Sequence, residues 1–201
     1  MDNFVDTWKK VITSPSEFYK SMPKEGGYGE PLKFALVNFI VLGIGSAIIS
    51  ILYSVIGFNL MNNAFRMGDS ATMATGFTII GAISDIIMTP ILGIIGLFIV
   101  GAILFVLFKI VGGSGSYEGT VRILSYSSAV SLLAWIPLVG IFAGLYGLYL
   151  DIVGGKFVHN ISTARSAIAV LIPIVLLIIL VVILAVVICT FGVGTSSYTT
   201  P

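Results

Sequence analysis

The chain has 201 residues, of which 57% are hydrophobic and only 9% are charged. Its mean hydropathy is +1.11 and its formal net charge is +1. An ordinary soluble domain carries about 25% charged residues, so this composition excludes a soluble globular protein. It predicts an all-α integral membrane protein, a polytopic helical bundle in the lipid bilayer. The near-neutral charge gives no indication of nucleic-acid binding.

Residues 1–31 form the only sizeable polar segment and are predicted to hold short amphipathic helices at the membrane interface. Apolar side chains recur there at helical spacing on one face, and a Ser-Pro-Ser-Glu run starts a second short helix. This face suits either a protein partner on the cytoplasmic side or contact with lipid headgroups. Its residues are Phe4, Trp8, Val11, Ile12 and Phe18.

Five apolar stretches are predicted to cross the membrane as transmembrane helices. A span needs about 20 residues, and the second stretch, at about 48 Å of helix, must tilt, kink or project. A polar loop is expected over residues 59–76. The membrane domain then covers residues 32–192, and residues 193–201 form an extracytoplasmic tail. The predicted spans are residues 34–58, 77–108, 121–136, 138–153 and 166–191.

A tight turn, Trp-Ile-Pro-Leu-Val-Gly at residues 135–140, joins the third and fourth stretches. Pro137 lacks an amide donor and cannot continue the preceding helix, so the two arms are predicted to form an antiparallel hairpin. Gly140, Gly144 and Gly147 share one helical face, which permits close helix packing. The residues leave open whether the hairpin crosses the bilayer completely or enters and returns from one side.

Four residues are candidates for an intramembrane polar site: Asp85, Arg122, Tyr126 and Asp151. Arg122 precedes Pro137 by 15 residues and Asp151 follows it by 14, which places both about 21–23 Å from the turn. We expect the two to pair, because pairing avoids a stranded charge. The pair is either structural or part of a polar site at the inner mouth of the bundle. Asp85 is either a mid-membrane site or a hydrated residue of the outer interface.

No motif indicates an enzyme, a cofactor or a metal. Residues 112–116 are rich in glycine but lack the context of a phosphate loop, so they predict a flexible turn. His159 is the only histidine and has no cysteine near it, so we expect it to face solvent or lipid headgroups. Cys189 is the only cysteine, which excludes an intrachain disulfide. We therefore predict a non-enzymatic protein without cofactor or metal.

The basic residues predict the orientation in the membrane. With five spans, nine of the ten lysines and arginines fall on one side. Basic loops remain in the cytoplasm, so the N-terminus is predicted to be cytoplasmic and the C-terminus extracytoplasmic. The nine residues are Lys9, Lys10, Lys20, Lys24, Lys33, Lys109, Arg122, Lys156 and Arg165, and Arg66 lies on the other side.

Three runs in and around the hairpin resemble the Yip domain family of Ypt/Rab-interacting proteins, and residues 159–167, 14–19 and 31–34 fit the same pattern. The three runs are Gly-Ser-Tyr-Glu-Gly-Thr-Val-Arg-Ile-Leu-Ser-Tyr-Ser-Ser at 115–128, the turn at 135–140, and Gly-Leu-Tyr-Gly-Leu-Tyr-Leu at 144–150. The resemblance covers about residues 5–176 and implies five membrane helices with a cytoplasmic N-terminus. Eukaryotic relatives act in vesicle traffic and associate with Rab-type GTPases through a longer N-terminal region. With about thirty residues before its first span, this chain resembles the short prokaryotic-type members.

Two functions fit these observations. The preferred one is a scaffold that organises membrane or recruits a partner. The alternative is a small transporter or channel for an ion, a proton or a lipid-like substrate that uses the four polar residues above. A transporter predicts a water-accessible cavity at Asp151 or Asp85, whereas a scaffold predicts a packed interior. The sequence leaves open a homo-oligomer, the protein partner and any ligand.

Overall fold

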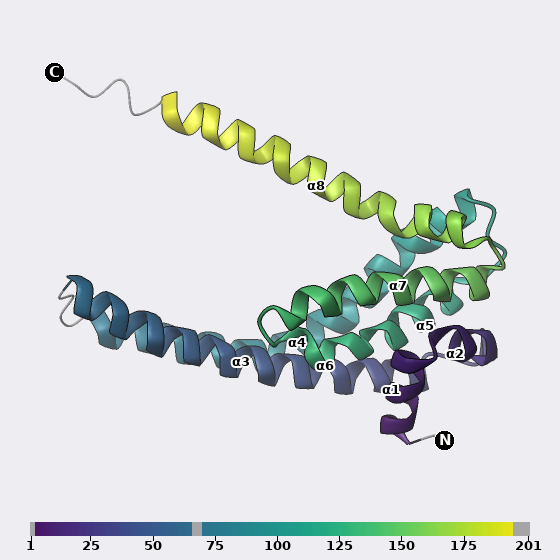
Figure 1. Cartoon of the computed structure of the whole chain (residues 1–201), viewed down its shortest axis with the longest axis horizontal. Helices are drawn as coiled ribbons and strands as arrows, with labels where there is room; N and C mark the ends of the chain where they lie inside the picture. The colour runs from purple at the N-terminus through teal and green to yellow at the C-terminus, as the bar shows by residue number, and fades with distance from the viewer. Residues whose placement is uncertain (1–2, 66–69, 195–201) are drawn as a thin grey trace.

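The computed structural model describes residues 3–65 and 70–194, with side chains at residues 3–57 and 78–190. Every regular element in these ranges is helical, which confirms the predicted all-α class (Figure 1). In chain order the elements are α1 (Phe4–Thr13), α2 (Pro15–Ser21), α3 (Gly29–Phe65), α4 (Ser70–Ile110), α5 (Tyr117–Ser127), the 3₁₀ turn η1 (Ser128–Val130), α6 (Ser131–Ala134), α7 (Val139–His159) and α8 (Thr163–Gly194).

Four helices of the described part are long and apolar enough to cross a membrane. Their candidate spans are Gly29–Gly57 in α3, Thr78–Ile110 in α4, Val139–His159 in α7 and Thr163–Thr190 in α8. In α8, every side chain of residues 176–184 is large, apolar and exposed. Such a surface is unfavourable in water and suits contact with lipid. The helices therefore support an integral membrane protein.

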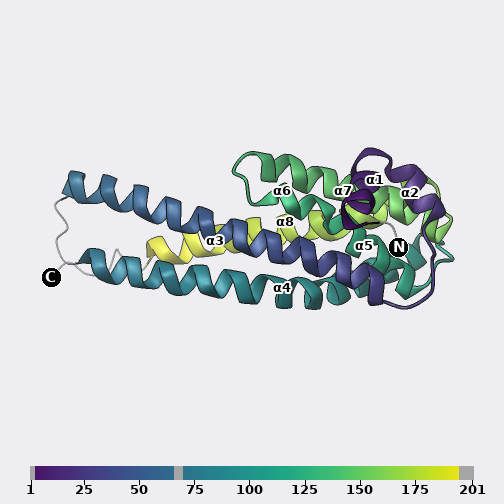
Figure 2. The same ribbon diagram turned by 90° about the horizontal axis from the view of Figure 1, so that it is seen from below.

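Helices α3 and α4 form a long antiparallel pair that lies side by side in both ribbon views (Figures 1 and 2). Two glycines allow this close contact. A Cβ atom on Gly43 would lie 2.8 Å from the Asp85 carbonyl oxygen, and one on Gly93 would lie 2.6 Å from the Phe39 ring. Small residues at such positions let membrane helices approach each other closely.

The loop expected over residues 59–76 is largely helical, which corrects that prediction. Helix α3 continues to Phe65 and α4 begins at Ser70. Residues 59–65 contain neither proline nor glycine, so nothing in their chemistry ends the helix there. Residues 66–69, which include Arg66, lie outside the described part of the chain. Residues 193 and 194 of the expected tail belong to α8, which ends at Gly194. Residues 195–201 also lie outside the described part of the chain.

The predicted third span, residues 121–136, is not one continuous α-helix. Helix α5 ends at Ser127, a 3₁₀ turn follows, and α6 adds a single short turn. The Ser128 hydroxyl donates to the Ser125 carbonyl at 2.6 Å, and Ser127 donates to Ile123 at 2.9 Å. Hydroxyls that bond back to their own helix compete with regular α-helical bonding. The described residues therefore contain four span-length helices and one broken arm, where the sequence predicted five spans.

Helix α5 is the centre of the fold, because two hydrophobic cores meet on it. Residues 119–127 are all buried. Ile123 and Tyr126 belong to a core shared with the N-terminal helices and α7, and Leu124 belongs to a second core formed with α4 and α8. A helix with four buried hydroxyl residues is thus shielded from lipid by its neighbours. This burial explains why its sequence is the least apolar of the predicted spans.

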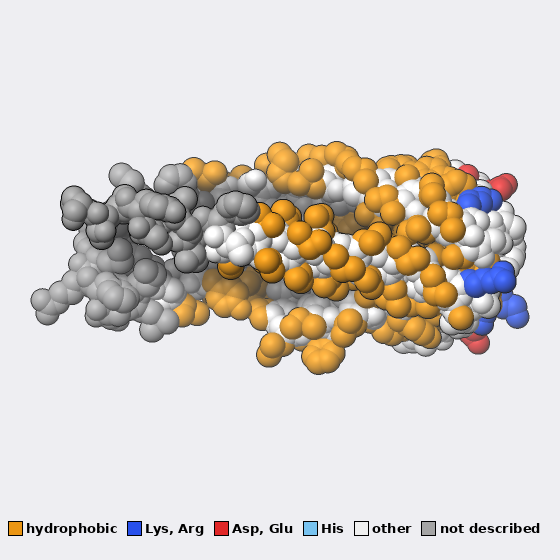
Figure 3. Space-filling view, turned by 90° about the horizontal axis from the view of Figure 1, so that it is seen from above, with side chains coloured by type: hydrophobic (Ala, Val, Ile, Leu, Met, Phe, Trp, Pro, Cys, Tyr) orange, Lys and Arg blue, Asp and Glu red, His pale blue; other side chains and the backbone are white. Residues whose placement is uncertain are grey.

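The two ends of the molecule differ in bulk and in charge. The short helices α1, α2 and α5 gather at one end, whereas only α3, α4 and α8 reach the other (Figures 1 and 2). Lysine, arginine and acidic side chains gather at the bulky end, and hydrophobic side chains cover the described surface beyond it (Figure 3). Positive charge marks the cytoplasmic side of membrane proteins. We call this part of the molecule the charged end.

Residues 135–138 form the turn between α6 and α7. The Val139 amide donates to the Pro137 carbonyl at 2.8 Å, and Leu138 adopts a positive φ of 66°. Gly140 lies directly against the backbone of Ala134, where a side chain would not fit, and a Cβ on Gly147 would lie 3.3 Å from Val130. By contrast, a Cβ on Gly144 would meet no atom within 4 Å. Within this chain, Gly144 therefore makes no close helix contact.

Candidate functional site

The N-terminal helices are held on the bundle by two hydrogen bonds to α1, one at its middle and one near its C-terminal end. The Trp8 indole donates to the Ala129 carbonyl at 2.9 Å, and the Tyr146 hydroxyl donates to the Ile12 carbonyl at 2.6 Å. Val11, between them, has no exposed surface. A buried indole N–H needs an acceptor, and the 3₁₀ turn η1 supplies one.

The remaining apolar residues of this segment pack against aromatic rings of the bundle. The Phe4 ring centroid lies 5.0 Å from that of Phe34, and Phe18 lies 4.9 Å from Tyr126. The sequence assigned Phe4, Trp8, Val11, Ile12 and Phe18 to a surface for lipid or a partner. In the structure all five belong to or pack against the protein's own core. This face is therefore engaged within the chain.

Asp151, on α7, faces a small polar cluster between α2 and α5. The Ser127 side chain lies beside its carboxylate, whose Oδ1 is shielded from solvent and has no hydrogen-bond partner. The Tyr19 hydroxyl lies 3.0 Å from Ser127 Oγ and 3.4 Å from the Ile123 carbonyl. Burial raises the pKa of the Tyr19 phenol, which keeps this hydroxyl neutral. The cluster therefore joins α2, α5 and α7.

The predicted Arg122–Asp151 ion pair does not form, and Arg122 has other partners. Its guanidinium donates to Glu118 at 3.1 Å and to the Gly27 carbonyl at 2.7 Å. The Gly27 amide in turn donates to Glu118 at 2.7 Å. The three groups attach the loop between α2 and α3 to α5. The prediction compared only the distances of Arg122 and Asp151 from the turn and did not consider Glu118. A glutamate four residues before an arginine is a recognised helical pair.

His159 is completely buried, which corrects the expectation of an exposed histidine. Its ring stacks on Phe108 with centroids 4.3 Å apart, and Nε2 lies 2.9 Å from the Thr120 hydroxyl. The edge of the ring that carries Nδ1 lies against Gly113 and Gly115. A Cβ atom on Gly113 would lie 3.2 Å from Nδ1, and one on Gly115 would lie 2.8 Å from it. The glycine-rich residues 112–116 therefore form a packed loop around an imidazole. No signal in the single sequence linked this loop to His159.

Asp85 is separated from the other three candidate polar residues. The Ser50 hydroxyl on α3 donates to its carboxylate at 3.5 Å. A Cβ on Gly101 would lie 3.1 Å from Val121 of α5, and Asp85 precedes Gly101 by sixteen residues, or about 24 Å of helix. The structure thus brings Tyr126 and Arg122 into one region of α5 but leaves Asp85 on the far part of α4.

A pocket of about 670 Å³ opens between α1, α2 and the first turns of α3. Phe4, Phe18, Phe34 and Tyr126 form its apolar floor. Four charged side chains surround them: Lys10, Glu17, Glu30 and Lys33. Neither Asp85 nor Asp151 lines this pocket. The transporter alternative, which requires a cavity at one of those carboxylates, gains no support from it.

A helical bundle with four apolar helices of span length, a charged end and a packed polar interior defines the class of polytopic integral membrane proteins. Within that class, the model of the Yip1 domain matches residues 9–186 of the chain. The match covers most of the sequence, so the chain belongs to the Yip1 domain family. No curated protein matches the chain. No solved structure matches it either.

Proposed function

We propose that this protein is a non-enzymatic scaffold that organises the membrane through its shape. The observation that carries the proposal is the unequal bulk of its two ends. The short helices α1, α2 and α5 gather at the charged end, whereas only α3, α4 and α8 reach the opposite end (Figures 1 and 2). A protein that is wider in one leaflet favours a membrane that is convex on that side, as amphipathic helices in one leaflet do.

The orientation follows from the charges. Lys33 lies in the first turns of α3, Lys109 and Lys156 lie in the last turns of α4 and α7, and Lys24 donates to Asn160 at the end of α7. The positive-inside rule then puts this end, and the N-terminus, in the cytoplasm. The wider cross-section would lie in the cytoplasmic leaflet and favour membrane that is convex towards the cytoplasm.

The hairpin completes the proposed topology. Helix α7 has 21 residues, about 31 Å, but its last turns pack inside the charged end, where Val153, Val158 and His159 are buried. The rest of the helix therefore reaches only part of the way across hydrocarbon about 30 Å thick. Its neighbour, the broken arm from α5 to α6, enters from the charged end and is covered by α3, α4 and α7. The chain would then cross or enter the bilayer five times, which leaves the C-terminus outside the cytoplasm. Leu138 and Phe142, which are 75% and 72% exposed, would carry the hairpin tip in lipid.

The packing of α1 favours a membrane role over recruitment of a partner by the N-terminal helices. Recruitment through the apolar face of α1 would require that face to be free. Val11 is instead completely buried and Trp8 is hydrogen-bonded to η1. Separating α1 from the bundle would expose this core and leave a buried carbonyl without its donor, which is costly.

The test is the orientation of the purified full chain in vesicles of different size. In an Arg66→Gln background, which removes the basic residue of the opposite side, trypsin added outside cleaves only molecules whose charged end faces outwards, at sites such as Lys20 and Lys24. We expect the cleaved fraction to rise as the vesicles become smaller, because the wide end prefers the convex outer leaflet. Detergent-permeabilised vesicles give the fully cleaved reference. An orientation that is independent of vesicle size would contradict the proposal.

A further inference from the structure

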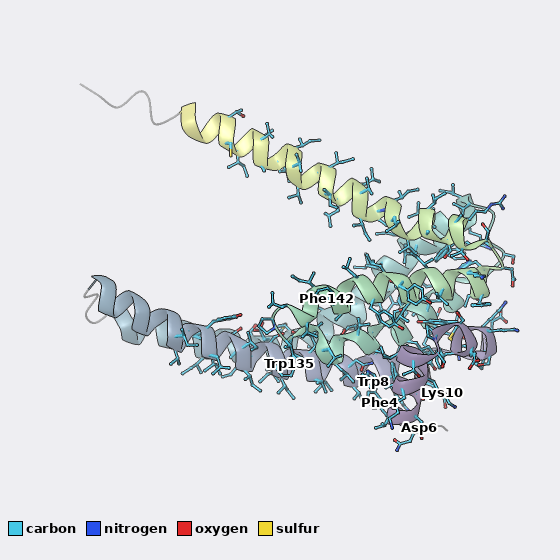
Figure 4. The ribbon with its side chains drawn as sticks, in the orientation of Figure 1. Phe4, Asp6, Trp8, Lys10, Trp135 and Phe142 are labelled. Atoms are coloured by element: carbon cyan, nitrogen blue, oxygen red, sulfur yellow. The ribbon has the colours of Figure 1, made fainter. Side chains whose placement is uncertain are left out.

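We propose that the pocket between α1, α2 and α3 binds a phospholipid with a zwitterionic headgroup. The inference requires only that the charged end lies at a bilayer surface, and it does not depend on the proposed effect on curvature. The pocket has a volume of about 670 Å³, which is within the range of small-molecule sites. Figure 4 places Phe4 and Lys10, two of its lining residues, on α1 where this helix crosses the charged end.

The position of the pocket matches the boundary between headgroups and hydrocarbon. Lys33 and Val37 are one turn apart on α3 and both line the pocket. Val37 is 41% exposed, and the same face continues with exposed Ile40 and Ile44. Below Lys33 the pocket therefore opens onto an apolar strip of α3. A headgroup held at Lys33 would place its acyl chain along this strip.

The charges around the pocket match a zwitterion. Lys10 and Lys33 bring positive charge that attracts a phosphate, whereas Glu17 and Glu30 bring negative charge that attracts an ammonium group. Hydrogen bonds between such ionised groups are stronger than neutral ones. An anionic headgroup would find the same lysines, but it would also meet both carboxylates without a compensating positive charge. The balance favours phosphatidylcholine or phosphatidylethanolamine over phosphatidylglycerol.

The floor of the pocket adds a second preference for a cationic amine. Phe34 lies between Phe4 and Tyr126, with ring centroids 5.0 and 5.3 Å away, and Phe18 completes the group 4.9 Å from Tyr126. Aromatic faces attract ammonium groups, and quaternary ammonium ligands are often bound in such clusters. Phe34 and Tyr126 are buried, so the partly buried rings of Phe4 and Phe18 are the ones that suit choline or ethanolamine beside two carboxylates, and they also provide the apolar wall that an acyl chain requires.

Native mass spectrometry of the full chain in detergent tests the inference. The delipidated protein is mixed with equal amounts of phosphatidylcholine, phosphatidylethanolamine and phosphatidylglycerol. We expect one zwitterionic lipid to be retained in preference to phosphatidylglycerol. Equal retention of all three, or a preference for phosphatidylglycerol, would overturn the proposal. Retention of a short peptide of similar mass in place of lipid would also overturn it, because the occupant would then be a protein segment.

Two charge variants and one matched control locate the site. Lys33→Ala and Glu30→Gln each remove one charge around the pocket, and we expect each to lower retention about two- to fivefold, as for exposed ion pairs. Lys20→Ala removes an exposed lysine of α2 that does not line the pocket, so retention should be unchanged. Melting temperatures equal to that of the wild type confirm that the variants are folded. Folded Lys33→Ala and Glu30→Gln variants with wild-type retention would exclude this pocket.

Soluble headgroups separate lipid binding from binding of a free ligand. Phosphocholine without acyl chains is added in excess to the lipid-bound protein. We expect it to displace the lipid poorly, because it lacks the chain that lies along Val37 and Ile40. Full displacement by phosphocholine at concentrations similar to those of the lipid would assign the pocket to a soluble metabolite and overturn the proposal.

Discussion

At the scale of single residues, burial and local pairing decided the roles of the charged and polar side chains. Arg122 was predicted to pair with Asp151 because the two lie at equal depth in the hairpin. Glu118 is one turn away on the same helix, and the Gly27 carbonyl accepts a second hydrogen bond from Arg122. A partner on the same helix is brought close by the helix itself. A partner on another helix also depends on the orientation of both helices about their axes.

Gly115 provides a test of the packed loop around His159. A Cβ at this position would lie 2.7 Å from the Val158 carbonyl oxygen and 2.8 Å from His159 Nδ1. Because the backbone oxygen cannot rotate away, we expect Gly115→Ala to destabilise the fold by about 1–3 kcal/mol, as overpacking does. The measurement is the melting temperature in detergent.

Gly144→Ala is the matched control for this prediction. A Cβ there would meet no atom within 4 Å, and alanine favours a helix over glycine by about 1 kcal/mol. This variant should therefore melt at the wild-type temperature or above it. If Gly115→Ala melts like the control, the loop is not packed as described.

At the scale of elements, the turn at Pro137 was predictable and the arm before it was not. Pro137 lacks an amide donor and α6 ends at Ala134, although α4 and α8 continue through Pro90 and Pro173. The break at Ser128 depends on which carbonyls the serine hydroxyls reach, and Asn38 of α3 also donates to Ser128 at 3.2 Å. The amphipathic pattern of α1 was visible in the sequence. The sequence did not reveal that α1 packs against protein rather than lipid, because either partner buries the same apolar face.

The two tryptophans test the placement of these elements. Trp135 lies near the tip of the hairpin and Trp8 lies on α1 at the charged end (Figure 4). The measurement is tryptophan fluorescence in bilayers that contain brominated lipids. We expect the fluorescence of Trp135 to be quenched most by bromine deep in the acyl chains, and that of Trp8 by bromine near the headgroups. Trp8→Phe and Trp135→Phe each leave one fluorophore for the measurement. Equal quenching profiles would contradict the arrangement, since α1 and the hairpin tip would then share one depth.

At the scale of the whole molecule, the asymmetry of charge and the asymmetry of bulk coincide. Charged side chains gather at the end where α1, α2 and α5 pack (Figure 3). This coincidence links orientation to shape, because the side that the positive-inside rule assigns to the cytoplasm is also the wider side.

Thiol labelling tests this orientation in cells. In a Cys189→Ser background, Lys24→Cys and Lys156→Cys should react with a membrane-impermeant maleimide only after the cells are permeabilised. Asp69→Cys, in the connection between α3 and α4, should react in intact cells. Lys20→Cys, also at the charged end, serves as a second reporter for that side. Labelling of Lys24→Cys in intact cells would reverse the orientation.

The sequence by itself determined the class, the helical content, the family resemblance and the turn at Pro137. These features depend on composition and on local chemistry: too few charges to cover a surface in water, apolar runs of span length, and a residue that cannot continue a helix. They require no knowledge of which segments meet.

Only the tertiary structure decided the burial of His159, the partners of Arg122, the docking of α1 and the pocket at the charged end. Each of these joins residues that are far apart in the chain, such as Trp8 with Ala129 and Phe108 with His159. Apolar and small residues are compatible with many neighbours, so their pattern does not select one. The selection comes from the simultaneous packing of several helices, in which most buried polar atoms also find a partner.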